Sequence, residues 1–289
     1  MYDILIKNAQ LRRKKGLWNI AIAKGVIAKI TQKPIRAKAG KVLDAGGNLV
    51  TEPFVNTHLH LCKVYTLEMM DSKALCAYHG ADMGGAMTAI ELAARVKANY
   101  NEKWILPNVR RALKLAALHG NLHIRAFADV DSKAKLIGLK ALLKARDEFK
   151  GIVDVQVCAF PQDGVVREPG TLDLMKEAMD LGADVVGGIP WIEFTEKDEQ
   201  IHIDEMMKLA IAYDKDISML VDDAGDPTLK TLEMLAVRTL EEGRIGRSLA
   251  HHARAMCLYP IPYFKKVATL LQQARMGVVS DPHTGPLHA

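Results

Sequence analysis

The sequence predicts an α/β fold built around a parallel sheet, and three observations support this prediction. From residue 53 onward, short apolar runs alternate with longer amphipathic stretches, which is the rhythm of βα units. The stretches between the runs have helical spacing, as at Leu172, Met175 and Met179, and also over 136–149 and 203–213. The runs that have the length and apolar content of buried strands are 54–57, 122–127, 153–160, 184–188, 217–221, 248–250 and 276–280.

Seven strands with helices between them indicate a (β/α)8 TIM-type barrel lacking its last βα unit, because a closed barrel of this kind needs eight strands. The sequence stops at Ala289, soon after the seventh run, so we expect an incomplete barrel over residues 53–289. Residues 1–52 are expected to form a small N-terminal β-sandwich module. Within it, runs 3–6, 19–23 and 26–30 alternate like strands, and Lys24-Gly25 suits a hairpin turn between the last two.

The composition excludes several function classes. The chain has 289 residues, of which 49% are hydrophobic and 25% charged, and its net charge of +5 is scattered rather than clustered, which disfavours nucleic acid as a partner. Because no apolar run approaches the roughly 18 residues of a membrane span, we expect no membrane partner. The N-terminal residues lack the charged-then-apolar order of a signal peptide, so we expect none. The cysteines form no CxxC pair, which favours reduced thiols in a cytoplasmic protein: Cys62, Cys76, Cys158 and Cys257.

Two histidines, His58 and His60, stand one residue apart at the end of the first predicted barrel strand. Side chains two residues apart on a strand project to the same face, and the C-terminal strand ends of such a barrel line its active site. Both imidazoles can therefore reach one divalent metal ion. Histidines with this spacing are common by chance, but their position after the N-terminal module and Pro53 favours a metal site.

Further candidates follow the sixth and fifth predicted strands. His251 and His252 are adjacent, and because neighbouring strand residues point in opposite directions, we expect only one of them to enter the pocket. Asp222, Asp223 and Asp226 follow the fifth strand. A carboxylate beside a metal-bound water can take its proton and pass it to a leaving amine. For Asp226, an ordinary solvated loop is the simpler interpretation.

Other polar and aromatic residues also stand at strand ends. Gln162 closes the third strand, where its carboxamide can donate to a ring carbonyl and accept from a ring N–H. Trp191 follows the fourth strand and is either an aromatic wall of the pocket or part of the ordinary core. Asp129 and Asp131 are interpreted as structural, for example as a helix cap. The Met- and Gly-rich segment 63–85 is a candidate lid.

Several stretches together resemble the cytosine deaminase branch of the amidohydrolase superfamily and its neighbours acting on triazine-type rings. The resemblance implies one divalent metal ion, Zn²⁺ or Fe²⁺, with His58, His60 and His252 as ligands. It also implies that Gln162 reads the edge of a pyrimidine and that Asp223 is the acid/base. The stretches that carry it are 53–60, 125–129, 153–164 (VDVQVCAFPQDG), 182–195 (GADVVGGIPWIEFT), 246–256 and the N-terminal ILIKNAQ, IAIAKGVIAKI and LDAGGNLV.

This sequence departs from the family pattern at three positions. Leu220 stands where the family has its fifth-strand histidine ligand, Cys62 replaces an aspartate after the paired histidines, and Phe127 replaces a histidine of the second strand. The last aspartate ligand would lie beyond Ala289. Two interpretations stay open: a subgroup with a rearranged pocket, or a fragment that binds metal poorly. In the first, the residues that could compensate are Asp222, Asp223 and His251.

The sequence therefore predicts a metal-dependent hydrolytic deaminase of a small nitrogen heterocycle, such as cytosine or isocytosine, that releases ammonia. A hydrolase of cyclic amides or aminotriazines is the alternative within enzymes. The alternative to an enzyme is a catalytically inactive fragment that associates with a partner chain through its exposed strand edges. The chain could also form a homo-oligomer. A dinucleotide- or phosphate-binding fold is disfavoured, because no GxGxxG or P-loop follows any strand.

Overall fold

A computed structural model describes residues 1–69 and 96–280 of the chain. The chain divides into two compact units, Met1–Pro53 and Phe54–Ala289. Within the described residues, none of the helices combines the length and apolar character needed to cross a membrane. The cysteines in this part of the chain are free thiols. Residues 70–85 of the candidate lid lie outside the described residues.

The N-terminal unit is a mixed sheet in the order β3-β2-β1-β4, with β5 beside β1. Both β4 and β5 run parallel to β1. The predicted hairpin joins β2 and β3 through Lys24 and Gly25, whose φ angles of 52° and 75° suit a two-residue type I′ turn. The strands are β1 (Tyr2–Leu11), β2 (Leu17–Ala23), β3 (Val26–Thr31), β4 (Ala39–Asp44) and β5 (Leu49–Val50).

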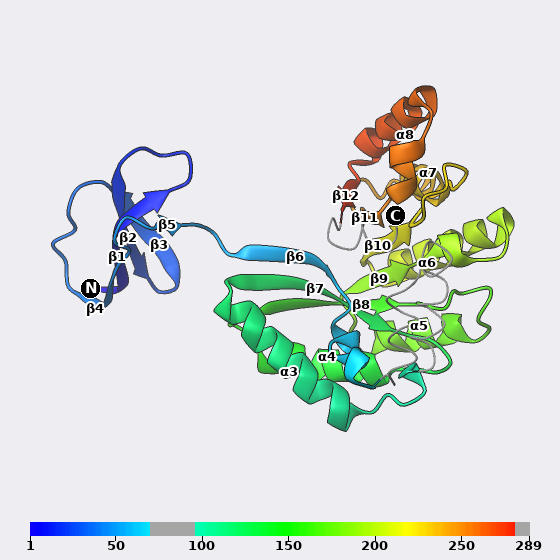
Figure 1. Cartoon of the computed structure of the whole chain (residues 1–289), viewed down its shortest axis with the longest axis horizontal. Coiled ribbons are helices and arrows are strands. Elements are labelled where there is room, and N and C mark those ends of the chain that lie inside the picture. The colour runs from blue at the N-terminus through cyan, green and yellow to red at the C-terminus, as the bar shows by residue number, and fades with distance from the viewer. Residues whose placement is uncertain (70–95, 281–289) are drawn as a thin grey trace. The chain divides into compact units, whose positions relative to one another are not determined.

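The second unit contains a seven-stranded parallel sheet whose strand order follows the chain, so the predicted barrel-type α/β fold is confirmed (Figure 1). All its strand pairs are parallel, and β6 and β12 are its two edge strands. The strands are β6 (Phe54–Leu59), β7 (Asn121–Asp129), β8 (Asp154–Phe160), β9 (Val185–Gly188), β10 (Asp216–Val221), β11 (Ser248–His252) and β12 (Gly277–Val279).

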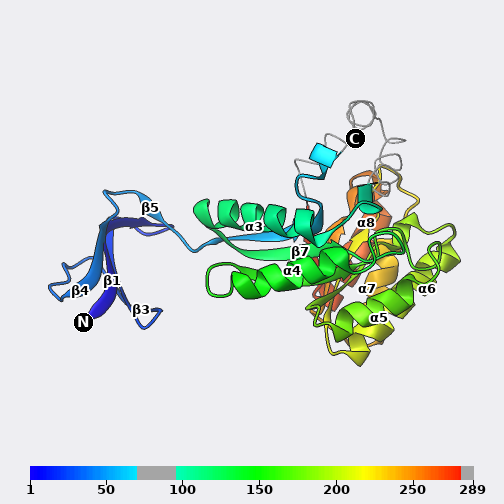
Figure 2. The ribbon, with the colours of Figure 1, turned by 90° about the horizontal axis from the view of Figure 1, so that it is seen from below.

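Helices alternate with these strands; α3 packs against α4, as Figure 2 shows, and α7 packs against both α6 and α8. Two of them begin at side-chain caps: Asn101 accepts the N–H of Trp104 at 2.9 Å, and Thr195 accepts that of Asp198 at 3.2 Å. The helices are α3 (Glu102–Leu118), α4 (Ile137–Glu148), α5 (Thr171–Asp180), α6 (Glu196–Ala212), α7 (Thr231–Glu241) and α8 (Ile261–Ala274).

Each barrel strand presents alternate residues to two different environments. In β7, Ile124, Ala126 and Ala128 belong to the core that packs against the helices. Phe127 faces the other way, into a separate cluster inside the sheet's concave side. The polar residues at the C-terminal ends of the strands therefore lie next to this interior apolar cluster. The other buried members of this interior cluster are Cys158, Phe160, Val185, Ile189, Ile192 and Leu220.

Candidate functional site

Three histidines predicted to share one metal ion lie together at the C-terminal ends of the strands. The rings of His58, in β6, and His60, directly after it, have centroids 5.0 Å apart. The ring of His252, from the end of β11, lies 4.8 Å from that of His58. The two-residue repeat of β6 puts the first two on one side, and the parallel sheet brings the third to the same edge.

The neighbouring histidine also enters this group, which differs from our expectation that only one of the pair would do so. The ring of His251 lies 4.8 Å from that of His58, the same separation that His252 shows. His252 has a φ of 68° and the following Ala253 a φ of 48°, so the backbone leaves the extended conformation here. The strict alternation of strand side chains ends at this point, and both rings can face the pocket.

A hydrogen-bonded chain runs from His58 into the floor of the site. The Nδ1 atoms of His58 and His251 are 3.0 Å apart, and His251 Nε2 lies 2.6 Å from Ser218 Oγ. Arg125 Nη1 donates to Ser218 Oγ at 3.3 Å, while its Nε and Nη2 donate to Gln156 Oε1. His251 and Ser218 are fully buried, whereas Gln156 at the far end of this chain is exposed.

The imidazoles of His58 and His60 are neutral near pH 7. Burial, followed by the neighbouring rings of His60, His251 and His252, lowers the pKa of His58 far below its usual value. Burial and the ammonium of Lys63 lower the pKa of His60 to about 4, despite Asp129. Neutral imidazole is the form that can ligate a metal ion.

A lysine and a carboxylate stand beside the histidines, and sequence reasoning gave neither a role in the site. Lys63 Nζ lies 3.1 Å from Asp129 Oδ2, and it also donates to Gln162 Oε1. Asp129 is fully buried, and its Oδ1 is 3.9 Å from His60 Nδ1. Although burial acts in the opposite direction, Lys63 and His60 hold the pKa of Asp129 below its usual range. This carboxylate is therefore ionised at the edge of the pocket.

A second buried lysine links three aspartates behind the pocket. Lys97 Nζ lies 2.7 Å from both Asp131 Oδ2 and Asp163 Oδ1, and 3.9 Å from Asp129 Oδ2. Burial opposes its charge, but the three carboxylates raise the pKa of Lys97. Asp131 also accepts the N–H groups of residues 133 and 134, as a cap does. Its structural interpretation agrees with these contacts, whereas Asp129 faces the site.

The two aspartates after β10 have different environments. Asp222 is fully buried and accepts from Thr231 Oγ1 at 2.6 Å and from the N–H groups of residues 231 and 232, so it anchors the start of α7. Asp223 lies beside the histidines: its Oδ1 is 2.9 Å from Arg254 Nε, and its Oδ2 is 3.7 Å from His252 Nε2. Asp226 is exposed and accepts from Thr228 at 2.7 Å within its loop.

The three residues that depart from the family pattern lie in buried apolar clusters. Phe127 lies under the histidines, with its ring 4.6 Å from that of His58, and Leu220 is buried in the same interior cluster. Cys62 is buried and accepts the N–H of Asp129 at 3.4 Å, and burial raises the pKa of its thiol to about 12. Trp191 packs on the interior cluster, and its buried Nε1 meets no hydrogen-bond partner within the described residues.

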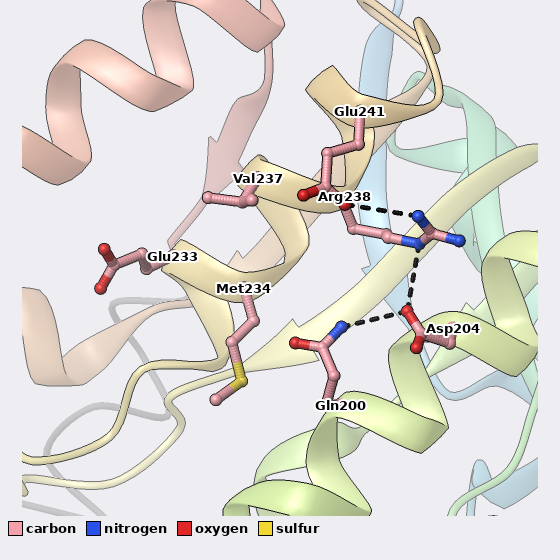
Figure 3. Close-up of a pocket in the computed structure, with 7 residues that line it drawn as sticks. All are labelled: Gln200, Asp204, Glu233, Met234, Val237, Arg238 and Glu241. Carbon is pink, nitrogen blue, oxygen red and sulfur yellow. Dashed lines mark hydrogen bonds and ion pairs between the residues drawn. The ribbon is translucent and has the colours of Figure 1, made fainter.

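A separate pocket of about 430 Å³ lies between α6 and α7 (Figure 3). Its charged groups already pair with one another: Arg238 Nε lies 3.1 Å from Asp204 Oδ1, Arg238 Nη1 lies 3.3 Å from Glu241 Oε2, and Gln200 donates to Asp204. Because it holds none of the predicted site residues, we place the candidate functional site at the strand ends.

The chain belongs to the amidohydrolase family, whose model matches residues 41–288. It is 31% identical over 290 aligned residues to the N-isopropylammelide isopropyl amidohydrolase of Pseudomonas sp. strain ADP, covering 99% of this chain and 70% of that protein. The family and this similarity define a hydrolase class that acts on carbon–nitrogen bonds.

Solved structures agree with this assignment. A 5-methylcytosine deaminase from Klebsiella pneumoniae, liganded with 5-fluorocytosine, superposes with a TM-score of 0.89 at 29% identity, covering 98% of this chain and 67% of that one. An N-isopropylammelide isopropylaminohydrolase from Burkholderia multivorans has a TM-score of 0.79 at 23% identity, covering 97% of this chain and 68% of that one, and supports the fold.

Enzymes of this family typically use one or two divalent metal ions, and the donor chemistry at the strand ends suits such an ion. The imidazoles of His58, His60 and His252 together reach the minimum of three protein ligands of a catalytic zinc site. As the side chains lie, however, the described residues contain no group of three or more His, Cys, Asp or Glu arranged to hold a metal. A metal ion would thus require these rings to readjust.

The residues that were expected to compensate for Leu220 are engaged elsewhere. Asp222 anchors α7, Asp223 pairs with Arg254, and His251 contacts Ser218 and His58. Their present contacts therefore do not supply a replacement for the fifth-strand ligand.

Proposed function

We propose that this protein hydrolyses the exocyclic C–N bond of a small, amino-substituted nitrogen heterocycle, with release of ammonia. The observation that carries the proposal is the gathering of His58, His60 and His252 beside Asp223, with ring centroids 5.0 and 4.8 Å from His58. The similarity to a 5-methylcytosine deaminase supports a pyrimidine such as cytosine or isocytosine as the substrate class.

In this proposal, His58, His60 and His252 would hold one divalent cation, Zn²⁺ or Fe²⁺. When bound, the cation supplies the Lewis acidity that makes water a nucleophile near neutral pH. Asp223 Oδ2 accepts a proton from the attacking water and passes it to the amino group. A C–O bond forms at the ring carbon, the C–N bond breaks, and ammonia leaves. The 3.7 Å between Asp223 Oδ2 and His252 Nε2 supports this position for the carboxylate.

The substrate ring would be oriented by polar groups on the other side of the pocket. Gln162 Oε1 accepts from Lys63, which leaves the amide nitrogen as the end of Gln162 that donates to a ring acceptor. Trp191 supports this side of the pocket, because its buried Nε1 lacks a partner in the described part of the chain. A planar heterocycle with acceptor atoms on its edge satisfies both groups.

A second candidate function is the hydrolysis of an N-alkylamino triazine, in which an alkylamine leaves in place of ammonia. The 31% identity to an N-isopropylammelide isopropyl amidohydrolase over nearly the whole chain favours it. The same residues would act, since the bond that breaks is again between a ring carbon and an exocyclic nitrogen.

A panel assay on the zinc-loaded and iron-loaded protein separates these functions. The substrates are cytosine, isocytosine, a pterin, an N-alkylamino triazine and a cyclic amide, and the products are followed as ammonia, alkylamine and opened ring. We expect ammonia from a pyrimidine, and loss of at least 10²-fold in rate in His60→Ala, with His123→Ala as the control because its side chain is 45% exposed and distant from the pocket. Ring opening without ammonia would overturn deamination.

A catalytically inactive chain that associates through its edge strands is the remaining alternative. Phe54 and Val55 lie on the edge strand β6, and 65% and 63% of their surfaces are exposed to solvent. Sedimentation of the purified chain distinguishes this alternative, because a stable monomer that releases ammonia needs no partner.

A further inference from the structure

The two residues proposed to contact the heterocycle stand on loops after neighbouring strands. Gln162 lies two residues after β8 and is buried, and Trp191 lies in the short 3-10 helix η3 (Pro190–Ile192) after β9. The last paired residues of the two strands are Ala159 and Val186, so the hydrogen-bonded ladder of the sheet ends before either loop begins. The relative placement of the two loops therefore depends on contacts beyond the sheet.

Glu193, the residue directly after η3, joins these two loops. Its side chain is buried, and its Oε1 accepts the backbone N–H groups of Val165 at 2.7 Å and Val166 at 3.2 Å. Its Oε2 accepts the backbone N–H of Arg167 at 2.9 Å. Although burial acts in the opposite direction, His202 and these N–H groups hold the pKa of Glu193 below its usual range. An ionised carboxylate thus holds the segment that follows Gln162.

His202 extends this connection to the other side of Trp191, and the direction of its hydrogen bonds is fixed. The backbone N–H of Ile189 can only donate, so His202 Nε2 accepts it at 3.1 Å and the ring proton lies on Nδ1. From Nδ1, His202 donates to Glu193 Oε1 at 2.8 Å. Because Ile189 stands two residues before Trp191, both ends of the segment that carries the indole are linked to one carboxylate.

Two further features of the loop after β8 match this arrangement. Arg167 Nη1 donates to the backbone oxygen of Ile192 at 2.7 Å, which adds a direct contact between the loops. Gly164 has a φ of 97°, and a Cβ at this position would lie 2.9 Å from Glu193 Oε1 and 2.5 Å from Arg167 Cγ. Only glycine allows the turn after Gln162 to come this close to the carboxylate.

We propose that Glu193 is a positioning residue for the substrate: its carboxylate couples the loop that carries Gln162 to the loop that carries Trp191, and so holds both in place before the ring binds. Contacts that are ordered in advance strengthen binding, because less freedom is lost when the ligand arrives. A glutamine cannot replace this carboxylate, since its amide hydrogens would face at least one of the four converging donors. The proposal rests on the proposed function for the roles of Gln162 and Trp191.

The first test compares the binding of cytosine to the zinc-loaded protein and to Glu193→Gln, by calorimetry and by steady-state kinetics. We expect the variant to bind cytosine about tenfold more weakly and to show a KM raised by about the same factor, with kcat within about threefold. The control is Thr239→Val, which removes a buried hydrogen bond of 2.7 Å to Ser248 Oγ, at the opposite end of β11 from the histidines. Unchanged affinity in Glu193→Gln, or an equal loss in the control, would overturn the proposal.

A double-mutant cycle shows whether Glu193 acts through Gln162. Gln162→Ala removes one of the contacts that Glu193 is proposed to position. We therefore expect the combined variant to lose less affinity for cytosine than the product of the two single losses. Two losses that multiply fully would show that the residues act independently, against the proposal.

Arg167→Ala tests the same coupling if Glu193→Gln does not fold. Its side chain is only partly buried, and its removal breaks the contact with Ile192 while leaving the carboxylate in place. We expect this variant to bind cytosine about threefold more weakly, with kcat nearly unchanged. An affinity equal to that of the unaltered protein would count against coupling between the loops.

The two proposals fail in different ways. If cytosine binds with these dependences but is not hydrolysed, the positioning role stands and the proposed function falls. If ammonia is released and the KM of Glu193→Gln is unchanged, the function stands and the positioning role falls. A zinc-loaded protein that neither binds nor hydrolyses any member of the substrate panel would overturn both.

Discussion

Glu193 and His202 form a buried pair near the pocket, with 2.8 Å between Oε1 and Nδ1. His202 Nε2 accepts the N–H of Ile189 at 3.1 Å, so neutral His202 carries its proton on Nδ1 and donates it to Glu193. Glu193 also accepts the backbone N–H groups of residues 165–167. The carboxylate of Glu193 therefore ties the loop after β8 to the second turn of α6.

Glu193→Ala should lower the free energy of unfolding by about 2–4 kcal/mol, because it leaves three backbone donors and His202 without their acceptor. Unfolding in guanidinium chloride measures this change. Glu177→Ala on the exposed face of α5 is the control and should change stability by less than about 0.5 kcal/mol. Equal effects of the two substitutions would mean that the hydrogen bonds of Glu193 do not stabilise the loop after β8.

Lys97→Met should destabilise the protein by about 3–5 kcal/mol, because three carboxylates, two of them fully buried, lose their common counter-charge. The matched control is Lys133→Met, whose ammonium is 46% exposed and lies 3.9 Å from Asp163, and it should have little effect. Thermal unfolding near pH 7 compares the two. A melting temperature unchanged by Lys97→Met would show that the aspartates do not need this lysine.

Glu199 gives the protein a pH-dependent stability that a glutamine at this position would remove. Burial, followed by the charges of Asp222, Glu196 and Glu193, raises its pKa from 4.5 to about 7. The folded state therefore binds a proton more tightly than the unfolded state, and the contribution of Glu199 to stability falls as pH rises from 4.5 through 7.

Glu199→Gln should accordingly stabilise the protein at pH 8 by about 1 kcal/mol after allowance for solvent screening, and the gain should vanish near pH 4. Denaturant unfolding at the two pH values measures it. Glu177→Gln serves as the exposed control. A gain of the same size at both values would contradict the raised pKa.

Leu220→His should increase zinc affinity by at least about tenfold, because it adds an imidazole to a strand end where the present donor set is incomplete. Leu220 pairs in register with His251, so its side chain stands next to the histidine group. Calorimetric titration with zinc checks the result. Leu220→Asn is the matched polar control, and equal affinity in the two variants would show that the added imidazole does not join the site.

The sequence predicted the barrel strands because each is a compact apolar run with helical stretches on either side. It did not predict β4 (Ala39–Asp44), which contains Gly40 and Lys41 and lacks a clear alternation. This strand forms because its backbone pairs in parallel with β1, some 37 residues earlier in the chain, in the register Tyr2↔Ala39. Pairing at such a distance leaves little local signal.

The site was predictable where it follows strand alternation. His58 and His60 lie on the same side of the sheet for this reason. Phe127 and Asp129 are likewise two residues apart on β7, and this spacing could have placed Asp129 beside the histidines. The entry of both His251 and His252 was not predictable, because a positive φ at a histidine has no sequence signature.

Lys97 gave no signal either. It lies 34 positions from Asp131 and 66 from Asp163 in the sequence, and only the folded sheet brings them together. A lone lysine in an amphipathic stretch is ordinarily solvated, whereas this one is buried among carboxylates that follow two adjacent strands.

The most direct test of the account is the location of zinc in crystals of the protein, by anomalous diffraction at the zinc edge. We predict a single strong peak at the strand ends, about 2.0–2.1 Å from one ring nitrogen each of His58, His60 and His252. Crystals saturated with zinc that show no peak among these three rings, or a peak held by other residues alone, would contradict it.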